Sequence, residues 1–308
     1  MSDWRERIDA AAERIIERVR RTPVMTTRAL APDNFPVDLK LEQMQHTGSF
    51  KVRGAFNTLL SSDVPAAGVV AASGGNHGAA VAYAAAKLGC RARIFVPELA
   101  GAAKVALIER TGADLVVVPG TYSEALAAAQ AWEIESGALQ VHAYDAPATV
   151  EGQGTLFREW ESQGLDADTV LVAVGGGGLI AGAMAWFGQY RKVVAVESEG
   201  CATLATALAN GPDAEIEVSG VAANALGARR IGRICYDLAR RQQIEALVLP
   251  DAEIVAAQRL MWQKLRQLTE PAGATALAAL ASGAYRPEHG ERVAVLICGA
   301  NPSPDPLG

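Results

Sequence analysis

The sequence lacks the patterns typical of disulfide-rich, zinc-binding and membrane-spanning proteins. Its four cysteines, at positions 90, 201, 235 and 298, form no C-x-x-C pair, and its four histidines form no H-x-x-x-H pattern. Neither a disulfide framework nor a zinc site is therefore predicted. No run of about eighteen apolar residues occurs, so no membrane span is expected, and the amphipathic N-terminus has no apolar signal core. We expect a protein of the reducing cytoplasm.

Charge of one sign is also scarce. The formal net charge is −6, the isoelectric point is near 5.4, and no basic block extends beyond the arginine pairs at 229–230 and 240–241. Nucleic acids and anionic membranes attract basic surfaces, so neither partner is expected. With 308 residues, 50% of them hydrophobic, the chain is long enough to form two lobes. These properties favour chemistry on a small molecule.

Short β-branched runs alternate with alanine-rich stretches along most of the chain. This alternation predicts an α/β fold with mostly parallel, twisted sheets and helices on both faces. Successive strand–helix units predict a small domain over residues 68–145, and residues 1–67 and 146–308 would form a large one. A ligand would bind between the lobes, at the carboxyl ends of strands. The expected strands are 68–72, 92–96, 114–118, 139–142, 169–174, 193–197, 245–249 and 292–297, and the expected helices are 4–21, 50–60, 77–88, 103–111, 122–136, 152–161, 179–190, 252–265 and 273–282.

One lysine stands in a distinctive setting. The segment 47–54 reads T-G-S-F-K-V-R-G and places Lys51 at the start of a predicted helix. An amine that is removed from water is a competent nucleophile and base, because burial disfavours its charged form. Such an amine can condense with an aldehyde, so Lys51 is a candidate anchor for pyridoxal phosphate. Taken alone, the same lysine could be a solvated residue in the first turn of the helix.

A glycine-rich turn, S-G-G-N-H-G at 73–78, follows a predicted strand and opens a helix. The N–H groups and the dipole of such a helix start point at an anion in the cleft, which suits a carboxylate. The side-chain amide of Asn76 could also bond a ring oxygen. In the alternative interpretation, Ser73 and Asn76 only cap the helix.

Four consecutive glycines at 175–178 separate an apolar strand from the next predicted helix. Without Cβ atoms in the way, the amides of this turn can wrap a phosphate. The turn also satisfies G-x-G-x-x-A, with Glu197 about twenty residues further on, which would suit a dinucleotide instead. After the last apolar strand, the thiol of Cys298 could face a pyridine nitrogen, or Cys298 could be a small buried hydrophobic residue.

Six motifs occur in the order found in fold-type II pyridoxal-phosphate enzymes. They are T-G-S-F-K-V-R-G-A, S-G-G-N-H-G, E-G-Q-G-T, G-G-G-G-L-I-A-G, E-P-A-G-A and C-G-A-N. Over residues 21–301 the chain closely resembles the serine/threonine dehydratases and the related serine racemases. The first, second and fourth motifs are specific in combination. The resemblance implies a two-lobed fold with the cofactor in the cleft between the lobes, and a homodimer, as is usual in the family.

The resemblance also implies a role for each motif residue. Lys51 would form the internal Schiff base and act as the base at Cα, and Phe50 would lie against the cofactor ring. Asn76 would bond the ring hydroxyl, and Cys298 would face the pyridine nitrogen. The residues expected to cradle the phosphate are Gly175, Gly176, Gly177, Gly178 and Leu179. Those expected to receive the substrate carboxylate, chiefly through backbone amides, are Ser73, Gly74, Asn76 and His77.

The reaction implied by the resemblance is an α,β-elimination. A β-hydroxy amino acid such as L-threonine or L-serine would give a 2-keto acid and ammonia. Racemases of this type carry a serine where this chain has Gly74, so dehydration is expected to dominate over racemisation. Serine racemisation, hydroxyaspartate dehydration and β-replacement are the alternatives within this chemistry. Outside it, the glycine turn at 175–178 could belong to a nucleotide-binding protein.

Some members of the family bind a divalent cation such as Mg²⁺. The corresponding positions in this chain hold Glu197, Cys201 and Thr203, and Thr203 replaces an expected carboxylate. Glu197 is therefore the candidate metal ligand, with Glu199 as the alternative, since carboxylate oxygens are the ligands that Mg²⁺ prefers. Glu197 could instead have a purely structural task at the end of its strand.

Overall fold

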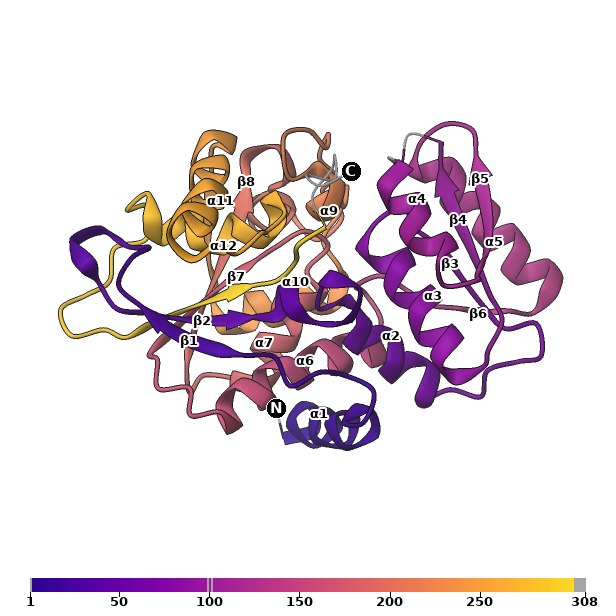
Figure 1. Ribbon diagram of the computed structural model, residues 1–308, viewed down its shortest axis with the longest axis horizontal. Helices are drawn as coiled ribbons and strands as arrows, with labels where there is room; N and C mark the ends of the chain where they lie inside the picture. Colours follow the sequence, from indigo (N-terminus) through magenta and orange to yellow (C-terminus); the bar gives the residue numbers. More distant parts are fainter. Residues whose placement is uncertain (1, 99, 101, 302–308) are drawn as a thin grey trace.

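Two sheets lie next to each other, and helices cover both faces of each (Figure 1). The computed structural model describes residues 2–98, 100 and 102–301. The larger sheet has six strands in the order β1-β2-β10-β7-β8-β9, and the smaller has four in the order β5-β4-β3-β6. Among the described strands, β1 and β2 pair antiparallel and the other neighbours pair parallel. The predicted α/β class with parallel-rich sheets is confirmed.

The larger sheet supplies the floor of the site. Its central strands β10, β7 and β8 are apolar and almost fully buried, as expected for parallel strands covered on both faces. Helices α11 and α12 lie on one side of this sheet, and α6, α7 and α10 lie on the other (Figure 1). The strands are β1 (Val24–Thr27), β2 (Val37–Leu41), β7 (Thr169–Ala173), β8 (Lys192–Ser198), β9 (Glu245–Leu249) and β10 (Val293–Ile297), and the helices are α6 (Pro147–Ser162), α7 (Gly178–Phe187), α10 (Arg233–Gln242), α11 (Asp251–Leu265) and α12 (Pro271–Ala281).

The smaller sheet buries alternate residues on opposite faces. Val69 and Ala71 of β3 pack in the cluster that includes α3, whereas Val70 and Ala72 pack against α5. This period of two is the expected geometry of a strand between two helical layers. The strands are β3 (Val69–Ala72), β4 (Ala92–Pro97), β5 (Asp114–Val118) and β6 (Leu139–Gln140), and the helices are α3 (Asn76–Leu88), α4 (Ala102–Glu109) and α5 (Tyr122–Ser136).

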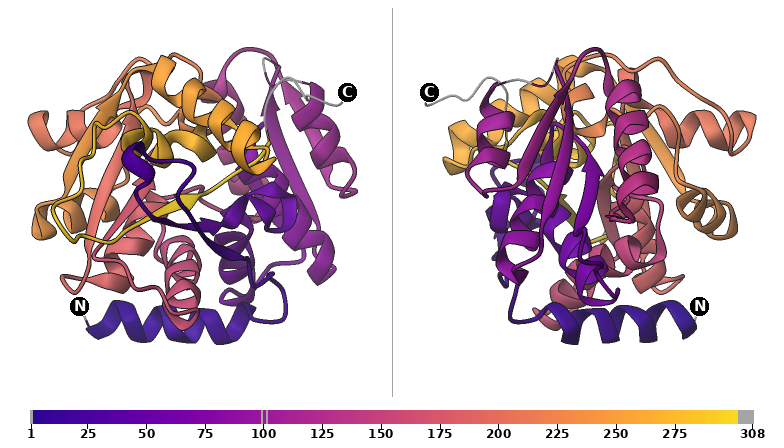
Figure 2. Two further views of the ribbon diagram at one scale, coloured as in Figure 1. Left: turned by 60° about the vertical axis from the view of Figure 1, so that its left-hand side comes forward. Right: turned by 90° about the vertical axis from the view of Figure 1, so that its right-hand side faces the viewer.

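Helix α2 (Lys51–Leu60) joins the two halves. Its apolar side chains, among them Val52 and Phe56, belong to the core of the smaller sheet, while its other face lies on α6. The contact with α6 is unusually close, because a Cβ on Gly152 would lie 2.6 Å from the Cα of Gly54. Helix α1 (Ser2–Ile15) runs along the base of the molecule beneath α6 and α2 (Figure 2).

Several elements differ from the sequence predictions. Strands β1 and β2 and the helices α8 (Thr203–Asn210), α9 (Ala223–Leu226) and α10 were not predicted, and α1 ends at Ile15 rather than near residue 21. The domain boundaries at 67/68 and 145/146 stay a prediction. Residues 1, 99, 101 and 302–308 of the predicted domains lie outside the part of the chain that the structure describes. Within that part, no helix combines the length and apolar character needed to span a membrane.

Candidate active site

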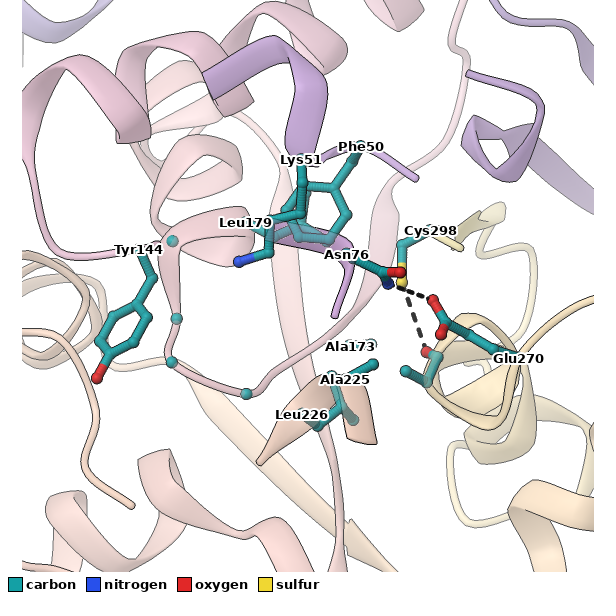
Figure 3. Close-up of a pocket in the computed structure, with 15 residues that line it drawn as sticks. Phe50, Lys51, Asn76, Tyr144, Ala173, Leu179, Ala225, Leu226, Glu270 and Cys298 are labelled. Atoms are coloured by element: carbon teal, nitrogen blue, oxygen red, sulfur yellow. Dashed lines mark hydrogen bonds between the residues drawn. The ribbon is translucent and has the colours of Figure 1, made fainter. Parts of the chain in front are cut away.

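A pocket lies where the carboxyl ends of β7 and β10 meet the starts of α2, α3 and α7 (Figure 3). Two backbone contacts fix the start of α2 there: Ser49 bridges Gly299, and the N–H of Phe50 donates to the carbonyl of Cys298 at 3.2 Å. The described residues that line the pocket are Phe50, Lys51, Asn76, Tyr144, Ala173, Gly175, Gly176, Gly177, Gly178, Leu179, Ala225, Leu226, Glu270, Ala272 and Cys298.

Lys51 is the first residue of α2, and its side chain extends toward the glycine turn (Figure 3). Its Nζ donates to the carbonyl of Ala143 at 2.8 Å and lies 5.2 Å from the centroid of the Phe50 ring. Removal from water lowers the pKa of Lys51 to about 8, and the Cys298 thiol opposes this shift. The amine is therefore neutral in a substantial fraction of molecules near physiological pH, as a nucleophile or base must be.

The four glycines form a tight turn between β7 and α7. Gly177 has a φ of +88°, a conformation that favours glycine. A Cβ on Gly176 would lie 2.4 Å from the ring of Tyr144, and one on Gly178 would lie 2.8 Å from the Tyr144 Cα. The turn thus lies directly against Tyr144, and the N-terminus of α7 faces the pocket with its partial positive charge.

Asn76, the first residue of α3, is held at both ends of its amide. Its Nδ2 donates to Oε1 of Glu270 at 2.6 Å, and its Oδ1 accepts from Nδ2 of Asn301 at 2.8 Å. Nδ2 of Asn301 also donates to the carbonyl of Thr47 at 2.7 Å. Asn76, Asn301 and Thr47 come from different parts of the chain, and the hydrogen bonds tie them together at the edge of the pocket.

Cys298 follows β10 and is buried at the wall of the pocket. Its thiol donates to the carbonyl of Ala272 at 3.5 Å. Burial, and then the negative charge of Glu270, raises the pKa of this thiol. Cys298 therefore presents a neutral sulfur to the pocket.

The turn at 73–78 contributes to the pocket through one residue. Of the four residues predicted to receive a carboxylate, chiefly through backbone amides, only Asn76 is among the described residues that line the pocket. Oγ of Ser73 accepts from the N–H of Gly75 at 3.1 Å, and Nε2 of His77 lies 2.8 Å from the carbonyl of Val141. Burial, together with the charge of Lys51, lowers the pKa of His77 to about 3, so its ring is neutral. The role in carboxylate binding stays a prediction.

Glu197 is fully buried at the end of β8 and interacts with the start of α8. Its oxygens accept from the backbone N–H groups of Leu204 and Ala205, each at 2.8 Å. Burial raises the pKa of Glu197 to about 7, although these two hydrogen bonds oppose the shift. In the described part of the chain, no group of three or more His, Cys, Asp or Glu side chains is arranged to hold a metal ion. The Glu197 cation site stays a prediction.

Comparison with known proteins assigns the chain to a family. Residues 15–299 match the model of the pyridoxal-phosphate dependent enzymes. The chain belongs to this family. It is therefore an enzyme that uses pyridoxal phosphate, as the motifs predicted, and the cleft described above contains the lysine and the glycine turn that such a cofactor needs.

Several members of the pyridoxal-phosphate family are similar over nearly the whole chain. A phenylserine dehydratase from Ralstonia pickettii is 37% identical, over 94% of this chain and 90% of the relative. An L-threonine ammonia-lyase from Geobacter sulfurreducens is 33% identical, over 95% of this chain and 74% of the relative. Among solved structures, maize serine racemase has a TM-score of 0.89 at 30% identity, covering 96% of this chain and 93% of that one. A threonine deaminase from T.th. has a TM-score of 0.88 at 32% identity, covering 98% of this chain and 99% of that one.

Two residues of the pocket were not identified from the sequence. Glu270 lay within the motif E-P-A-G-A without an assigned role, and Tyr144 lay in no motif. A carboxylate at the predicted start of α12 gave a signal for Glu270, but its partner Asn76 is 194 positions away. Burial raises the pKa of Tyr144 to about 12, and the neighbouring Tyr122 and Asp145 add to the shift, so its hydroxyl stays protonated.

Proposed function

We propose that the chain is an ammonia-lyase that dehydrates a β-hydroxy amino acid, such as L-threonine or L-serine, to a 2-keto acid and ammonia. The observation that carries the proposal is the Lys51 amine, with a pKa of about 8, directed at a glycine turn that opens α7. Relatives named dehydratases and ammonia-lyases support this reaction.

The pocket residues fit pyridoxal phosphate. Lys51 would hold the cofactor covalently through Nζ, and the backbone of residues 175–179 would bind its phosphate, because four glycines leave the amides accessible. Asn76 would bond the ring hydroxyl, Phe50 would pack on the ring, and the neutral thiol of Cys298 would face the pyridine nitrogen. Bound pyridoxal phosphate supplies an electron sink for the charge that proton removal leaves at the substrate Cα.

The chain's own groups would then move the protons. When its Nζ is not bonded to the cofactor, the neutral amine of Lys51 would be the base that removes the Cα proton. The start of α3 would bind the substrate carboxylate through the backbone amides and dipole of Ser73, Gly74, Asn76 and His77. The neutral ring of His77 adds no charge there. Lys51 in its protonated form can also donate the proton that the leaving hydroxide needs.

Gly74 supports dehydration rather than racemisation. Racemisation requires a proton donor on the face of the substrate opposite Lys51, and Gly74 has no side chain to donate. A Cβ on Gly74 would also lie 2.4 Å from the Cβ of Ala100, so this turn has no room for a side chain without rearrangement. Serine racemisation therefore remains the weaker candidate.

The nucleotide-binding alternative has less support. A dinucleotide site would use Glu197 to bond a ribose, whereas both oxygens of Glu197 accept hydrogen bonds from α8. We further propose the two domains as predicted, a homodimer in the cytoplasm, and Glu197 as the candidate ligand of a divalent cation such as Mg²⁺.

The test is a panel of β-hydroxy amino acids: serine, threonine, hydroxyaspartate and phenylserine, assayed for ammonia and keto acid with Mg²⁺ and with a chelator. We expect keto acid without any added thiol, and none from Lys51→Ala. Borohydride reduction and peptide mapping should find the cofactor on Lys51 of the wild-type protein. Product that forms only with a second nucleophile would instead establish β-replacement, and an unmodified Lys51 peptide from cofactor-loaded protein would exclude the anchor.

A further inference from the structure

Glu270 is a buried carboxylate in the pocket that the proposed reaction does not use. Its side chain is 2% exposed, it precedes α12, and its backbone N–H donates to the carbonyl of Gly299 at 3.1 Å. A Cβ on Gly299 would lie 2.1 Å from Oε1 of Glu270, so the carboxylate approaches the backbone closely at this glycine. The carboxylate is thus closely fitted into the wall of the site.

A chain of hydrogen bonds links four residues, from Thr47 through Asn301 and Asn76 to Glu270. The Thr47 carbonyl accepts from Nδ2 of Asn301 at 2.7 Å, Oδ1 of Asn76 accepts from the same nitrogen at 2.8 Å, and Oε1 of Glu270 accepts from Nδ2 of Asn76 at 2.6 Å. Figure 3 shows the last of these bonds beside Cys298. The two ends of the chain, a carbonyl and a carboxylate, can only accept hydrogen bonds.

Because both ends only accept, the direction of every hydrogen bond in this chain is fixed. A flipped Asn76 amide would place its oxygen against the Glu270 carboxylate and its nitrogen against Nδ2 of Asn301. Two favourable contacts would become an acceptor–acceptor and a donor–donor contact, each in a buried setting where unpaired polar groups are costly. The second N–H of Asn76 therefore remains as the group available to a ligand.

We propose that Glu270 is a positioning residue that fixes the amide of Asn76, so that Asn76 presents an N–H donor to the ring hydroxyl of pyridoxal phosphate. This inference rests on the proposed function. A donor at this position stabilises the ionised form of the ring oxygen, since hydrogen bonding to a charged form favours that form. Glu270 would therefore influence both the affinity for the cofactor and the pH dependence of its absorption.

The experiment compares three variants with the wild-type holoenzyme. Glu270→Met removes the acceptor and leaves a side chain of similar volume, whereas Glu270→Gln keeps an acceptor oxygen. In the double variant Asn76→Asp/Glu270→Gln the hydrogen bond is reversed, so that residue 270 donates and residue 76 accepts. The readouts are the dissociation constant of pyridoxal phosphate, the pH titration of its absorption spectrum, and the melting temperature of the apoprotein. Glu291→Gln is the matched control, because Glu291 also accepts hydrogen bonds from side chains, the hydroxyls of Tyr285 and Thr169, but is not among the described residues that line the pocket.

We expect Glu270→Met to weaken cofactor binding by about tenfold or more, as loss of a hydrogen bond to a charged group implies, and to shift the spectral titration. Glu270→Gln should stay within about threefold of wild type. The double variant should regain the melting temperature but not the affinity, because a carboxylate at position 76 offers only acceptor oxygens to the ring hydroxyl.

Wild-type affinity and an unshifted spectrum in Glu270→Met would overturn the proposal. If Glu270→Met does not fold, Glu270→Gln carries the test, because it keeps an acceptor for Asn76 and a loss of affinity well beyond about threefold would overturn the proposal. Failure of the proposed function has a different signature, since the wild-type protein itself would then retain no cofactor on Lys51.

Discussion

Lys51 owes its lowered pKa to its surroundings rather than to a cationic neighbour. Burial is the main cause, and the Cys298 thiol acts in the opposite direction. The helix start that holds the amine is fixed by the backbone bond between Phe50 and Cys298. Exclusion from water is therefore how the fold prepares this nucleophile.

We predict that capture of pyridoxal phosphate by the apoprotein accelerates with rising pH, with a midpoint near the pKa of Lys51, which is about 8. The sign follows from the chemistry, because only the neutral amine attacks the aldehyde and the protonated form dominates below the midpoint. Rapid mixing between about pH 6 and 10, followed by absorbance, measures the rate. A midpoint at the ordinary lysine pKa of 10.5 would contradict the prediction.

A second prediction concerns Gly74→Ser. The added Cβ would meet Ala100 and Val96, at 2.4 and 3.0 Å, so the turn has to shift. Overpacking of this kind costs about 1–3 kcal/mol. We expect a lower melting temperature and reduced keto-acid formation, with little D-serine from L-serine. Comparable rates of D-serine and pyruvate formation in this variant would show that room for the side chain exists. Comparable rates in the wild type would show that racemisation does not require a side chain at position 74. The double variant Gly74→Ser/Ala100→Gly, which removes the Ala100 clash, should recover part of the lost stability.

At the scale of elements, glycines set the distance between the helices that carry the site. Gly152 of α6 approaches Gly54 of α2, and a Cβ on Gly182 of α7 would lie 2.7 Å from the backbone N of Gly154 in α6. Three helices therefore pack backbone to backbone, which explains the G-Q-G motif in structural rather than catalytic terms. The position of Lys51 at the start of α2 depends on this packing.

Gly152→Ala should therefore destabilise the protein, since the new Cβ would lie 2.6 Å from the Cα of Gly54. We expect the free energy of unfolding to fall by about 1–3 kcal/mol, because backbone atoms cannot move aside as a flexible side chain can. Urea denaturation of the apoprotein measures it. Ser162→Ala, at the exposed end of the same helix, is the control and should change stability by less than about 0.5 kcal/mol. An equal, small effect of both variants would contradict the backbone contact.

Elements with regular apolar patterns were predictable from the sequence, and those defined by long-range contacts were not. The apolar strands and the alanine-rich helices follow their patterns closely, and β5 and β9 have the predicted limits. Strand β2 was missed because it alternates with Asp38 and Lys40, and burial of Lys40 depends on Glu159, far away in the sequence. Helix α10 was missed because it is short and rich in arginine.

The motifs predicted part of the pocket, but Ser73, Gly74 and His77 are not among the described residues that line it. Lys51, Asn76, the glycine turn and Cys298 do line one pocket. Glu270 escaped notice because its importance comes from a hydrogen bond to Asn76, a residue on the other side of the cleft. Tyr144 lines the pocket through its contact with the glycine turn, which no local pattern reveals.

At the scale of the whole molecule, a buried cluster of charges ties the N-terminal segment to α2 and α6. Arg53 donates to Glu42 at 2.6 Å and to Glu159 at 3.0 Å, and Lys40 donates to Glu159 at 2.5 Å. Arg53 and Lys40 are almost fully buried. Breaking such a cluster by removing one partner costs about 3–5 kcal/mol, because it leaves an uncompensated buried charge.

This cluster predicts an acid sensitivity. Burial alone would raise the pKa of Glu159, but the charges of Arg53 and Lys40 outweigh it, and the net pKa is lowered from 4.5. A carboxylate with a lowered pKa contributes its full stability above its unfolded pKa, and the contribution is lost as the pH falls through the folded pKa. The free energy of unfolding should therefore fall below about pH 4.5 more steeply in the wild type than in Glu159→Gln.

Chemical denaturation at several pH values measures this dependence. Glu159→Gln should also be less stable than the wild type at neutral pH, since it leaves Lys40 and Arg53 short of a partner. Glu288→Gln, an exposed substitution, should reproduce the wild-type profile. Parallel pH profiles for all three proteins would mean that Glu159 has no lowered pKa.

The location of helix α2 has a mechanical consequence. Its first residues are tied to the end of β10, while its apolar side chains are embedded in the core beneath the smaller sheet. A movement of that sheet relative to the larger one would therefore displace the far end of α2 more than its first residues. Lys51 lies at the tied end, so its amine would keep its place beside the glycine turn.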